Sequence, residues 1–232
     1  MSELQGFGFV LPHWLYWGWL ATMPFFMLYM VKREASKGIV DTSTAPDELI
    51  PDILAEEDPV INIEGNQVTK FIDKISDYTG LFIAFWTVNA VVFYFYEVVM
   101  RYLFNMPTIW VHEASFLLFG MQYLMTGAYA MLHGAHVRVD ILYVKLPPRG
   151  RVGIDIFTSV FFFIFVLALM GTSWEFFTSS FEMKEISLET WGIQYWPVKM
   201  LMFTGAILLT LAGISKLIKD IMLFRLMGEE NK

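Results

Sequence analysis

Five long apolar runs occupy most of this chain, and no other feature constrains its fold as strongly. They cover residues 9–31, 78–104, 114–132, 156–174 and 200–215. A helix needs about 20 apolar residues to cross the hydrocarbon core of a bilayer. A hydrophobic content of 56% and a mean hydropathy of +0.51 are also high for a soluble domain. The sequence therefore predicts an all-α, polytopic helical membrane protein.

The order of the runs predicts four parts. They are an extra N-terminal transmembrane helix at 1–33, an acidic cytoplasmic linker at 34–68, a four-span domain at 69–225 and a cytoplasmic tail at 226–232. Pro12 and Pro24 interrupt the first run, so a kinked or re-entrant segment is the alternative there. Apolar residues of 69–77 share one helical face. This pattern predicts either an interfacial amphipathic helix or a plain extension of the second span.

Composition excludes several classes of function. The chain has no cysteine, which excludes disulfides, thiolate catalysis and cysteine-ligated metals. Its net charge of −7 comes mainly from 38–69, where eight acidic residues occur without Lys or Arg, a segment that would repel nucleic acid. Because nearly all residues lie in spans and short connections, no separate catalytic domain fits. We predict no enzymatic activity, no catalytic residue, no cofactor, no metal and no nucleic-acid partner.

Basic residues predict the orientation of the chain. Thirteen of the 16 Lys and Arg residues follow the first, third and fifth runs, and such residues are enriched on the cytoplasmic side. The N-terminus is therefore expected outside and the C-terminus in the cytoplasm. Because only Glu3 precedes the first run and Lys32 and Arg33 follow it, no cleaved signal peptide is expected. The expected outer aromatic belt contains Trp14, Trp17, Trp19, Trp110, Trp191 and Trp196.

Few polar residues interrupt the spans, and each needs a partner in hydrocarbon. Asn89 lies at mid-depth of the second run. Glu97 and Arg101 are one helical turn apart in the favourable order for an ion pair. That pair indicates either a contact with a partner or an interfacial pair whose Arg reaches the headgroups. Glu113 falls in the first turn of the third span, where its charge favours the helix N-terminus.

The densest polar motif follows the third run. His133 and His136 are three residues apart, as in half of a metal site, but no further ligand lies nearby and Gly134 weakens the helix. We therefore predict no metal there. Arg138 and Asp140 alternate with valines, so a short extended or turn-like segment at the cytoplasmic boundary could pair them.

Together these motifs resemble the small membrane subunit, of DctQ type, of tripartite ATP-independent periplasmic (TRAP) transporters. The resemblance covers about residues 70–220 in four spans. Its motifs are Arg101-Tyr-Leu-Phe104, Trp110-x-x-Glu113, Gly134-Ala-His-Val-Arg-Val-Asp140 and Tyr195-Trp-Pro197. The sequence departs from the usual subunit at its front, where an extra span and the acidic linker precede the four-span unit.

The resemblance implies a non-catalytic, accessory role in sodium-dependent import of an organic anion across the bacterial cytoplasmic (inner) membrane. The large membrane subunit of such systems is expected to hold the sodium and substrate sites and to move substrate by an elevator-like motion. The small subunit would enlarge the stationary scaffold and help to dock the periplasmic substrate-binding protein. Partners are therefore the large TRAP membrane subunit, the periplasmic substrate-binding protein and membrane lipids. Candidate structural or subunit-interface residues are Arg101, Trp110, Glu113, His136, Arg138 and Asp140.

Two other functions remain open from the sequence. A haem-binding membrane anchor of a redox complex needs facing histidines, and His13 and His112 could both lie near the outer surface. A channel or exporter needs a polar stripe, and Asn89, Gln122 and Thr126 make only a thin one. The chain has no internal repeat, which argues against a complete secondary transporter. The substrate, among dicarboxylates, sialic acids, 2-oxo acids and sulfonates, is not encoded here.

Overall fold

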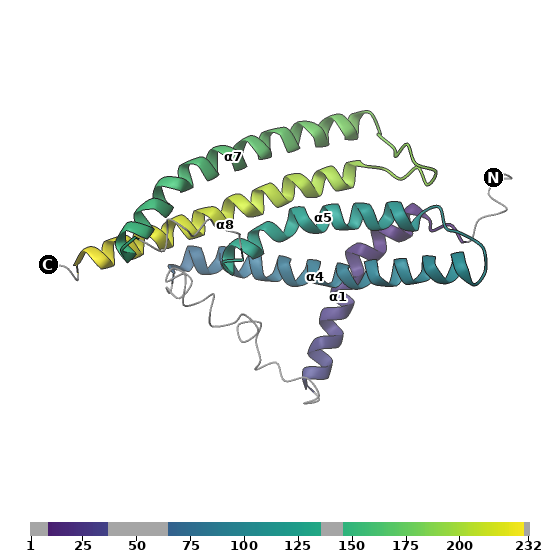
Figure 1. The fold of residues 1–232 in the computed structure, drawn as a ribbon, viewed down its shortest axis with the longest axis horizontal. Helices are drawn as coiled ribbons and strands as arrows, with labels where there is room; N and C mark the ends of the chain where they lie inside the picture. Colours follow the sequence, from purple (N-terminus) through teal and green to yellow (C-terminus); the bar gives the residue numbers. More distant parts are fainter. Residues whose placement is uncertain (1–8, 37–64, 136–145, 230–232) are drawn as a thin grey trace. The chain divides into compact units, whose positions relative to one another are not determined.

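A computed structural model describes residues 9–36, 65–135 and 146–229. These ranges contain the helices α1 (His13–Ser36), α4 (Gln67–Tyr102), α5 (Val111–Leu132), α7 (Pro148–Glu182) and α8 (Trp196–Glu229) (Figure 1). Within the same ranges there is no strand, and the only strand-like pairing is an isolated bridge between Ile186 and Gln194. The prediction of an all-α fold is confirmed.

Four of the helices, α4, α5, α7 and α8, are long and apolar enough to cross a membrane. They contain the second to fifth apolar runs, so the prediction of a polytopic helical membrane protein is also confirmed. The 24-residue helix α1 follows the first run but is not among these four. Its crossing of the membrane remains a prediction.

Helix α4 begins earlier than the second apolar run. The Asn66 side chain caps it by accepting a hydrogen bond from the backbone N–H of Gln67, 2.7 Å away. Residues 69–77 are the first turns of this continuous helix. Whether these turns lie in the membrane interface stays a prediction. At the other end of the chain, α8 continues to Glu229, so residues 226–229 of the predicted tail are helical.

The described residues form two compact units, each built from parts of several helices. The first unit contains 9–36, 81–125 and 173–202, and the second contains 65–80, 126–172 and 203–229. In the first unit, α1 crosses the C-terminal half of α4 instead of running alongside it (Figure 1). The buried side chains of this unit come from α1, α4, α5 and the connection before α8. They include Tyr16, Leu20, Ile83, Trp86, Trp110, Leu118, Met121 and Trp191.

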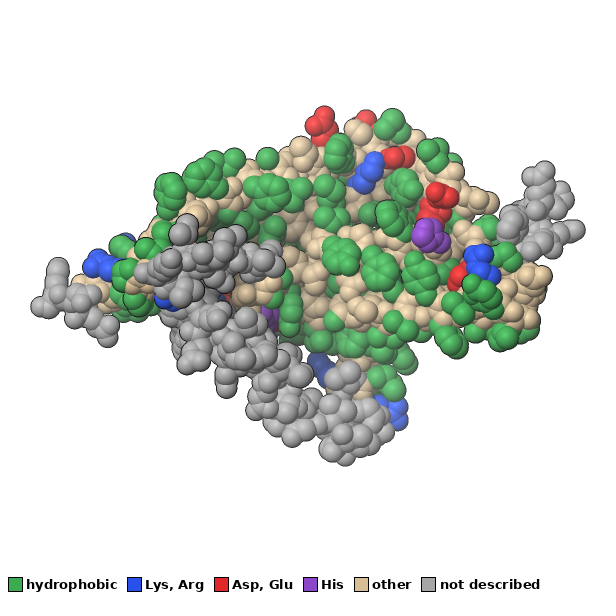
Figure 2. Space-filling model, viewed as in Figure 1, with side chains coloured by type: hydrophobic (Ala, Val, Ile, Leu, Met, Phe, Trp, Pro, Cys, Tyr) green, Lys and Arg blue, Asp and Glu red, His purple; other side chains and the backbone are tan. Residues whose placement is uncertain are grey.

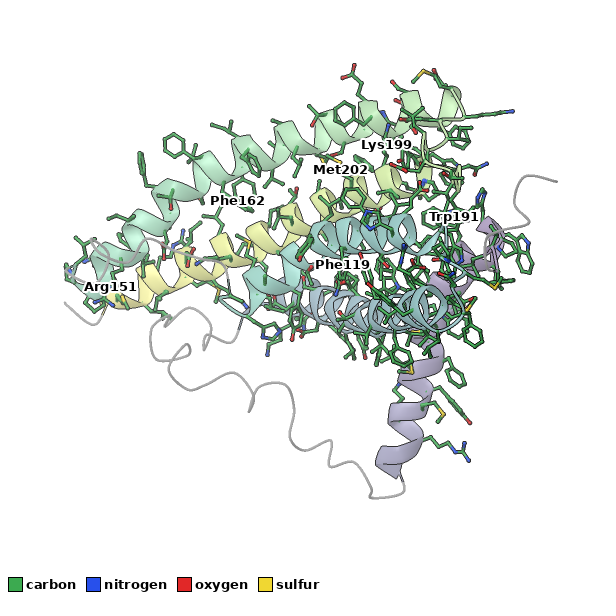
Figure 3. The ribbon with its side chains drawn as sticks, turned by 45° about the vertical axis from the view of Figure 1, so that its right-hand side comes forward. Phe119, Arg151, Phe162, Trp191, Lys199 and Met202 are labelled. Carbon is green, nitrogen blue, oxygen red and sulfur yellow. The ribbon has the colours of Figure 1, made fainter. Side chains whose placement is uncertain are left out.

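The second unit is held by close contacts between helices. Val152 of α7 and Leu223 of α8 form a small buried core there. Gly213 of α8 leaves room for the ring of Phe162, which Figure 3 labels. A Cβ added at Gly213 would lie 2.3 Å from Cε1 of that ring. Small residues allow helix backbones to approach in this way, which matters in a bilayer, where burial of apolar surface gives little driving force.

Helix α7 leaves much of its apolar surface uncovered by the rest of the described chain. Hydrophobic side chains gather along it in Figure 2. Exposed large residues of α7 include Phe157, Val160, Phe161, Ile164, Phe165, Leu167, Trp174 and Phe176. Such a surface is suited to lipid chains or to another membrane helix.

Candidate functional site

The first unit contains a set of side chains that bind the backbone of the N-terminal segment. The indole N–H of Trp110 donates to the carbonyl oxygen of Phe9 at 2.7 Å, and that of Trp191 donates to Leu11 O at 2.9 Å. The His13 ring contacts the carbonyl oxygen of Trp191 through Nε2 at 2.9 Å. The carbonyls of Phe9 and Leu11 precede α1 and have no place in its helical ladder, so side-chain donors satisfy them.

The same kind of contact continues along α1. The Tyr16 hydroxyl donates to the carbonyl oxygen of Ala114 at 2.7 Å. The Trp86 indole donates to the carbonyl oxygen of Leu20 at 2.9 Å. A carbonyl inside a helix can accept this second bond because it has two lone pairs. We call this surface, between residues 9–23 and the rest of the first unit, the α1 interface.

The mid-span amide of Asn89 finds its partners in the α1 interface. Trp19 donates its indole N–H to Asn89 Oδ1 at 2.7 Å, and Asn89 Nδ2 lies 3.5 Å from the sulfur of Met23. Only 4% of Asn89 is exposed. An unpaired amide at this depth would cost free energy, because hydrocarbon offers no hydrogen bond in exchange.

Aromatic packing fills the space between these hydrogen bonds. The rings of Tyr16 and Trp191 meet edge to face, with centroids 5.2 Å apart and planes at 81°. Phe93 and Trp110 pack in the same way at 5.4 Å and 79°. Edge-to-face pairs stabilise a contact beyond the area that they bury. The α1 interface is therefore both hydrogen-bonded and densely aromatic.

Three predicted site residues belong to the first unit. The Arg101 guanidinium pairs with the Glu97 carboxylate, as the spacing predicted. The other Glu97 oxygen accepts a hydrogen bond from the backbone N–H of Thr108 at 2.9 Å, so the pair also fixes the loop before α5. Trp110 is buried in the α1 interface. Glu113 lies in the first turn of α5, as predicted, and is 5% exposed.

The Glu113 carboxylate has an unusual environment. Neither of its oxygens is accessible, and neither accepts a hydrogen bond from any residue in the described ranges. The other three predicted residues, His136, Arg138 and Asp140, lie outside the described residues. The neighbouring His133 is described, and its Nε2 lies 2.8 Å from Asp77 Oδ1. Among the residues that the structure covers, no group of three or more His, Cys, Asp or Glu could hold a metal ion.

Comparison with known families decides the class of this protein. The family model for the DctQ component of tripartite ATP-independent periplasmic transporters matches residues 90–222. The chain belongs to the DctQ family. The match runs from the middle of α4 into α8 and covers more than half of the chain. No curated protein sequence matches the chain.

Family membership confirms the resemblance seen in the sequence, so this DctQ chain is a small membrane subunit of a TRAP transporter. The haem-anchor alternative gains no support. In this DctQ subunit, His13 already contacts the carbonyl oxygen of Trp191, and His112 is exposed on α5.

The matched segment begins after α1, yet α1 supplies the partners of Asn89 and of the Trp86 indole. Sequence reasoning missed this interface in the DctQ subunit. It placed Trp110 and Trp191 in an outer aromatic belt, which stays a prediction, and did not foresee that both are buried with their N–H groups on backbone carbonyls. The density of tryptophan in 14–19 together with a mid-span Asn was the available signal.

A second polar cluster of the DctQ subunit lies in the second unit and was also missed. Asp73 accepts hydrogen bonds from Ser215 Oγ and Lys219 Nζ, both at 2.7 Å. Lys216 pairs with Asp220 one turn along α8, at 3.3 Å. The sequence analysis counted the two lysines only as basic residues of the cytoplasmic side. The partner of Lys219 on α4 could not be foreseen, because it is 146 positions away.

Proposed function

We propose that this chain is the non-catalytic small subunit of a sodium-dependent TRAP transporter that imports an organic anion. It enlarges the stationary scaffold of the large membrane subunit and helps to dock the substrate-binding protein. The observation that carries this proposal is the family match over four helices of spanning length. The exposed apolar surface of α7 supports it, because a scaffold subunit needs a wide face for another membrane protein.

Reconstitution tests the proposal. Liposomes that contain this subunit, the large membrane subunit and the binding protein should take up an organic anion when a sodium gradient is applied. Liposomes without the large subunit should show none, because the sequence of the small subunit has no internal repeat of the kind that builds transport sites. Sodium-driven uptake by the small subunit alone would contradict the proposal.

The proposal includes an orientation in the inner membrane. The distribution of Lys and Arg supports a periplasmic N-terminus and a cytoplasmic C-terminus. A reporter enzyme that works only in the periplasm, fused before Phe9, should be active, and the same reporter fused after Lys232 should be inactive. The reverse pattern would mean that the direction of the chain is wrong.

On this orientation, two connections of the first unit face the periplasm. The loop 103–110 exposes Leu103 and Phe104, and the connection 183–195 exposes Met183 and Leu188. Exposed apolar side chains on loops outside the spans are suited to a protein contact, so we assign part of the docking surface to them. Leu188→Ser should weaken binding of the binding protein to the assembled complex, and Thr172→Ser, at an exposed position of α7, is the control.

The segment with Arg138 and Asp140 is proposed as a clasp that orders the connection from α5 to α7. Arg138→Ala should then lower the yield of the complex with the large subunit and leave the sodium dependence of surviving complexes unchanged. Asp140→Ala should lower the yield in the same way. The double variant should lose less yield than the two single losses added together, because the two residues act as one unit. Intact complexes that have lost transport after Arg138→Ala would assign this segment to transport itself.

A further inference from the structure

Three arginines of the second unit lie where α7 begins and α8 ends. Arg149 and Arg151 belong to the first turn of α7, and Arg225 belongs to the last turns of α8. Figure 2 shows Lys and Arg side chains beside this part of the two helices, and Figure 3 labels Arg151. The turns 148–156 and 221–228 contain these three arginines and one carboxylate, an excess of two positive charges. We call the three residues the arginine cluster.

The packing of α7 on α8 holds Arg149 in place. Its guanidinium lies over the ring of Phe224, 5.0 Å from the ring centroid. Its Nη2 lies 3.3 Å from the position of a Cβ at Gly228, so the side chain reaches the last turn of α8. A cation over an aromatic ring is attracted by the ring quadrupole. Neither contact supplies a carboxylate, and Arg149 stays exposed.

The dipole of α7 adds to the positive charge of the cluster. The N-terminus of a helix carries a partial positive charge, so carboxylates are favoured there and guanidinium groups are not. The first turn of α7 nevertheless contains two arginines and no acidic residue. The one carboxylate of these turns, Asp155, comes one turn after Arg151 and is partly buried. An anion bound beside the exposed guanidinium groups would offset their repulsion.

The arginine cluster lies just beyond the apolar surface of α7. This helix has 35 residues and is therefore about 50 Å long, whereas the hydrocarbon core of a bilayer is about 30 Å thick. The exposed large apolar side chains of α7 begin at Ile154 and continue with Phe157 and Phe161. Guanidinium groups at the end of such a surface reach the lipid headgroups, while the rings beside them contact acyl chains.

We propose that the arginine cluster binds the headgroup of an anionic phospholipid, such as phosphatidylglycerol. The lipid phosphate accepts hydrogen bonds from the guanidinium groups, whose N–H donors form a fork that suits phosphate oxygens. The acyl chains lie along the exposed rings of Phe157 and Phe161. A zwitterionic headgroup fits less well, because its own cation is repelled by the arginines. The site does not depend on the proposed function, since an anionic bilayer supplies the ligand.

Thermal unfolding of the full-length subunit in a neutral detergent tests this site. The micelles contain either phosphatidylglycerol or phosphatidylcholine with the same acyl chains, at equal ionic strength. A ligand that binds only the folded state raises Tm, and phosphatidylglycerol should raise it on the order of 5 °C more than phosphatidylcholine. Arg149→Gln should lose most of this difference between the lipids. Arg225→Gln should lose part of it, and it keeps the test decisive where Arg149→Gln does not fold, because the contact of Arg149 with Phe224 stays in place.

Lys74→Gln is the matched control. Lys74 is also an exposed basic residue of the second unit that lies over a ring, 5.9 Å from the centroid of Tyr78. Its replacement changes the net charge by the same amount and should keep the full difference between the lipids. Arg149→Lys keeps the charge but loses the fork of donors, so its response should fall between those of the wild type and Arg149→Gln.

Two further measurements separate a lipid from a free anion. Inorganic phosphate at the concentration of the lipid should leave Tm unchanged, because it offers nothing to the apolar surface of α7. Native mass spectrometry should detect phosphatidylglycerol on the wild type and on Lys74→Gln, and roughly tenfold less of it on Arg149→Gln, as expected for the loss of a charge-assisted contact.

Four results would overturn the proposal. The first is an equal rise in Tm with both lipids, since the charge of the headgroup would then not matter. The second is an equal loss of the lipid difference in Lys74→Gln and Arg149→Gln, which would indicate diffuse attraction to a basic surface. The third is a full wild-type response in folded Arg149→Gln or in Arg225→Gln. The fourth is a rise with inorganic phosphate as large as that with phosphatidylglycerol, because the acyl chains would then contribute nothing.

Discussion

Trp19 of α1 donates its indole N–H to the amide oxygen of Asn89 in the middle of α4, across 2.7 Å. These residues are 70 positions apart, and both precede the region that the family model matches, which begins at residue 90 of α4. The amide of a span normally needs a partner from its own bundle. The N-terminal helix meets this need here, so α1 is part of the packed core of the first unit.

The first prediction concerns the energy of that pair. Trp19→Phe keeps most of the apolar contact but removes the N–H, and Asn89→Leu removes the acceptor. Each change alone should destabilise the subunit, by about 0.5–1.5 kcal/mol for a hydrogen bond in a membrane protein. The double variant should lose less than the sum of the two, as measured by unfolding in detergent micelles.

Trp14→Phe is the matched control for this cycle. Trp14 lies on the same helix but is 75% exposed, so its replacement should leave the free energy of unfolding nearly unchanged. Strict additivity of Trp19→Phe and Asn89→Leu would show that the two side chains do not interact in the membrane domain.

The second prediction concerns the approach of α4 to α5 in the second unit. A Cβ at Gly80 would lie 2.2 Å from Cδ2 of Tyr129 and 2.8 Å from its Cβ. The side chain cannot rotate its own Cβ away, so Gly80→Ala forces the backbones apart. Overpacking of this kind costs about 1–3 kcal/mol, which exceeds the gain of up to about 1 kcal/mol in helix propensity.

Gly120→Ala gives the opposite expectation and serves as the comparison. Nothing lies within 4 Å of a Cβ at Gly120, so only the propensity gain applies there. Gly80→Ala should lower Tm and Gly120→Ala should hold or raise it. An equal change in Tm for the two variants would contradict the close contact of Gly80 with Tyr129.

The third prediction concerns the Asp73–Lys219 pair. Lys219 is 9% exposed, so Asp73→Asn leaves a nearly buried ammonium without its counter-charge. Removing one partner of a buried pair is expected to cost on the order of 2–3 kcal/mol, and Lys219→Met should partly rescue Asp73→Asn. Unfolding of the single and double variants measures this effect. Lys74→Met, at an exposed position of α4, should have little effect.

The fourth prediction concerns pH and the connection before α8. The Lys199 ammonium, through its hydrogen bond, holds the pKa of the Glu185 carboxyl below its ordinary value of 4.5. Because the pKa is lower in the folded state, this contact stabilises the protein above about pH 4.5 and is lost as the pH falls through the folded pKa. The two side chains are 29% and 34% exposed, so solvent screens the pair and the effect is at most about 1 kcal/mol.

Unfolding at neutral pH and near pH 4 measures this contribution. The wild type should lose more stability between the two conditions than Glu185→Gln, in which no carboxylate titrates at this position. Glu189→Gln, at an exposed position of the same connection, is the control and should lose as much as the wild type. A variant at Glu185 with the full wild-type pH response would contradict the contact.

The sequence alone determined the helices and their class. Runs of about 20 apolar residues leave the helix as the structure that satisfies its own backbone in hydrocarbon, so α4, α5, α7 and α8 were predictable in number and place. The Glu97–Arg101 pair was predictable as well, because the two residues lie one turn apart on one predicted helix. The DctQ motifs also indicated the family from the sequence alone.

Tertiary structure decided which side chains meet across helices. The burial of Trp110 and Trp191, the partner of Asn89 and the pairing of Asp73 with Lys219 all join residues more than 65 positions apart. In a bilayer, hydrophobicity does not distinguish a lipid-facing tryptophan from a buried one, because both surroundings are apolar. Hydrogen-bond geometry distinguishes them, and it depends on where the carbonyls of Phe9 and Leu11 are placed by α1. Those positions follow from packing, which no local pattern of residues encodes.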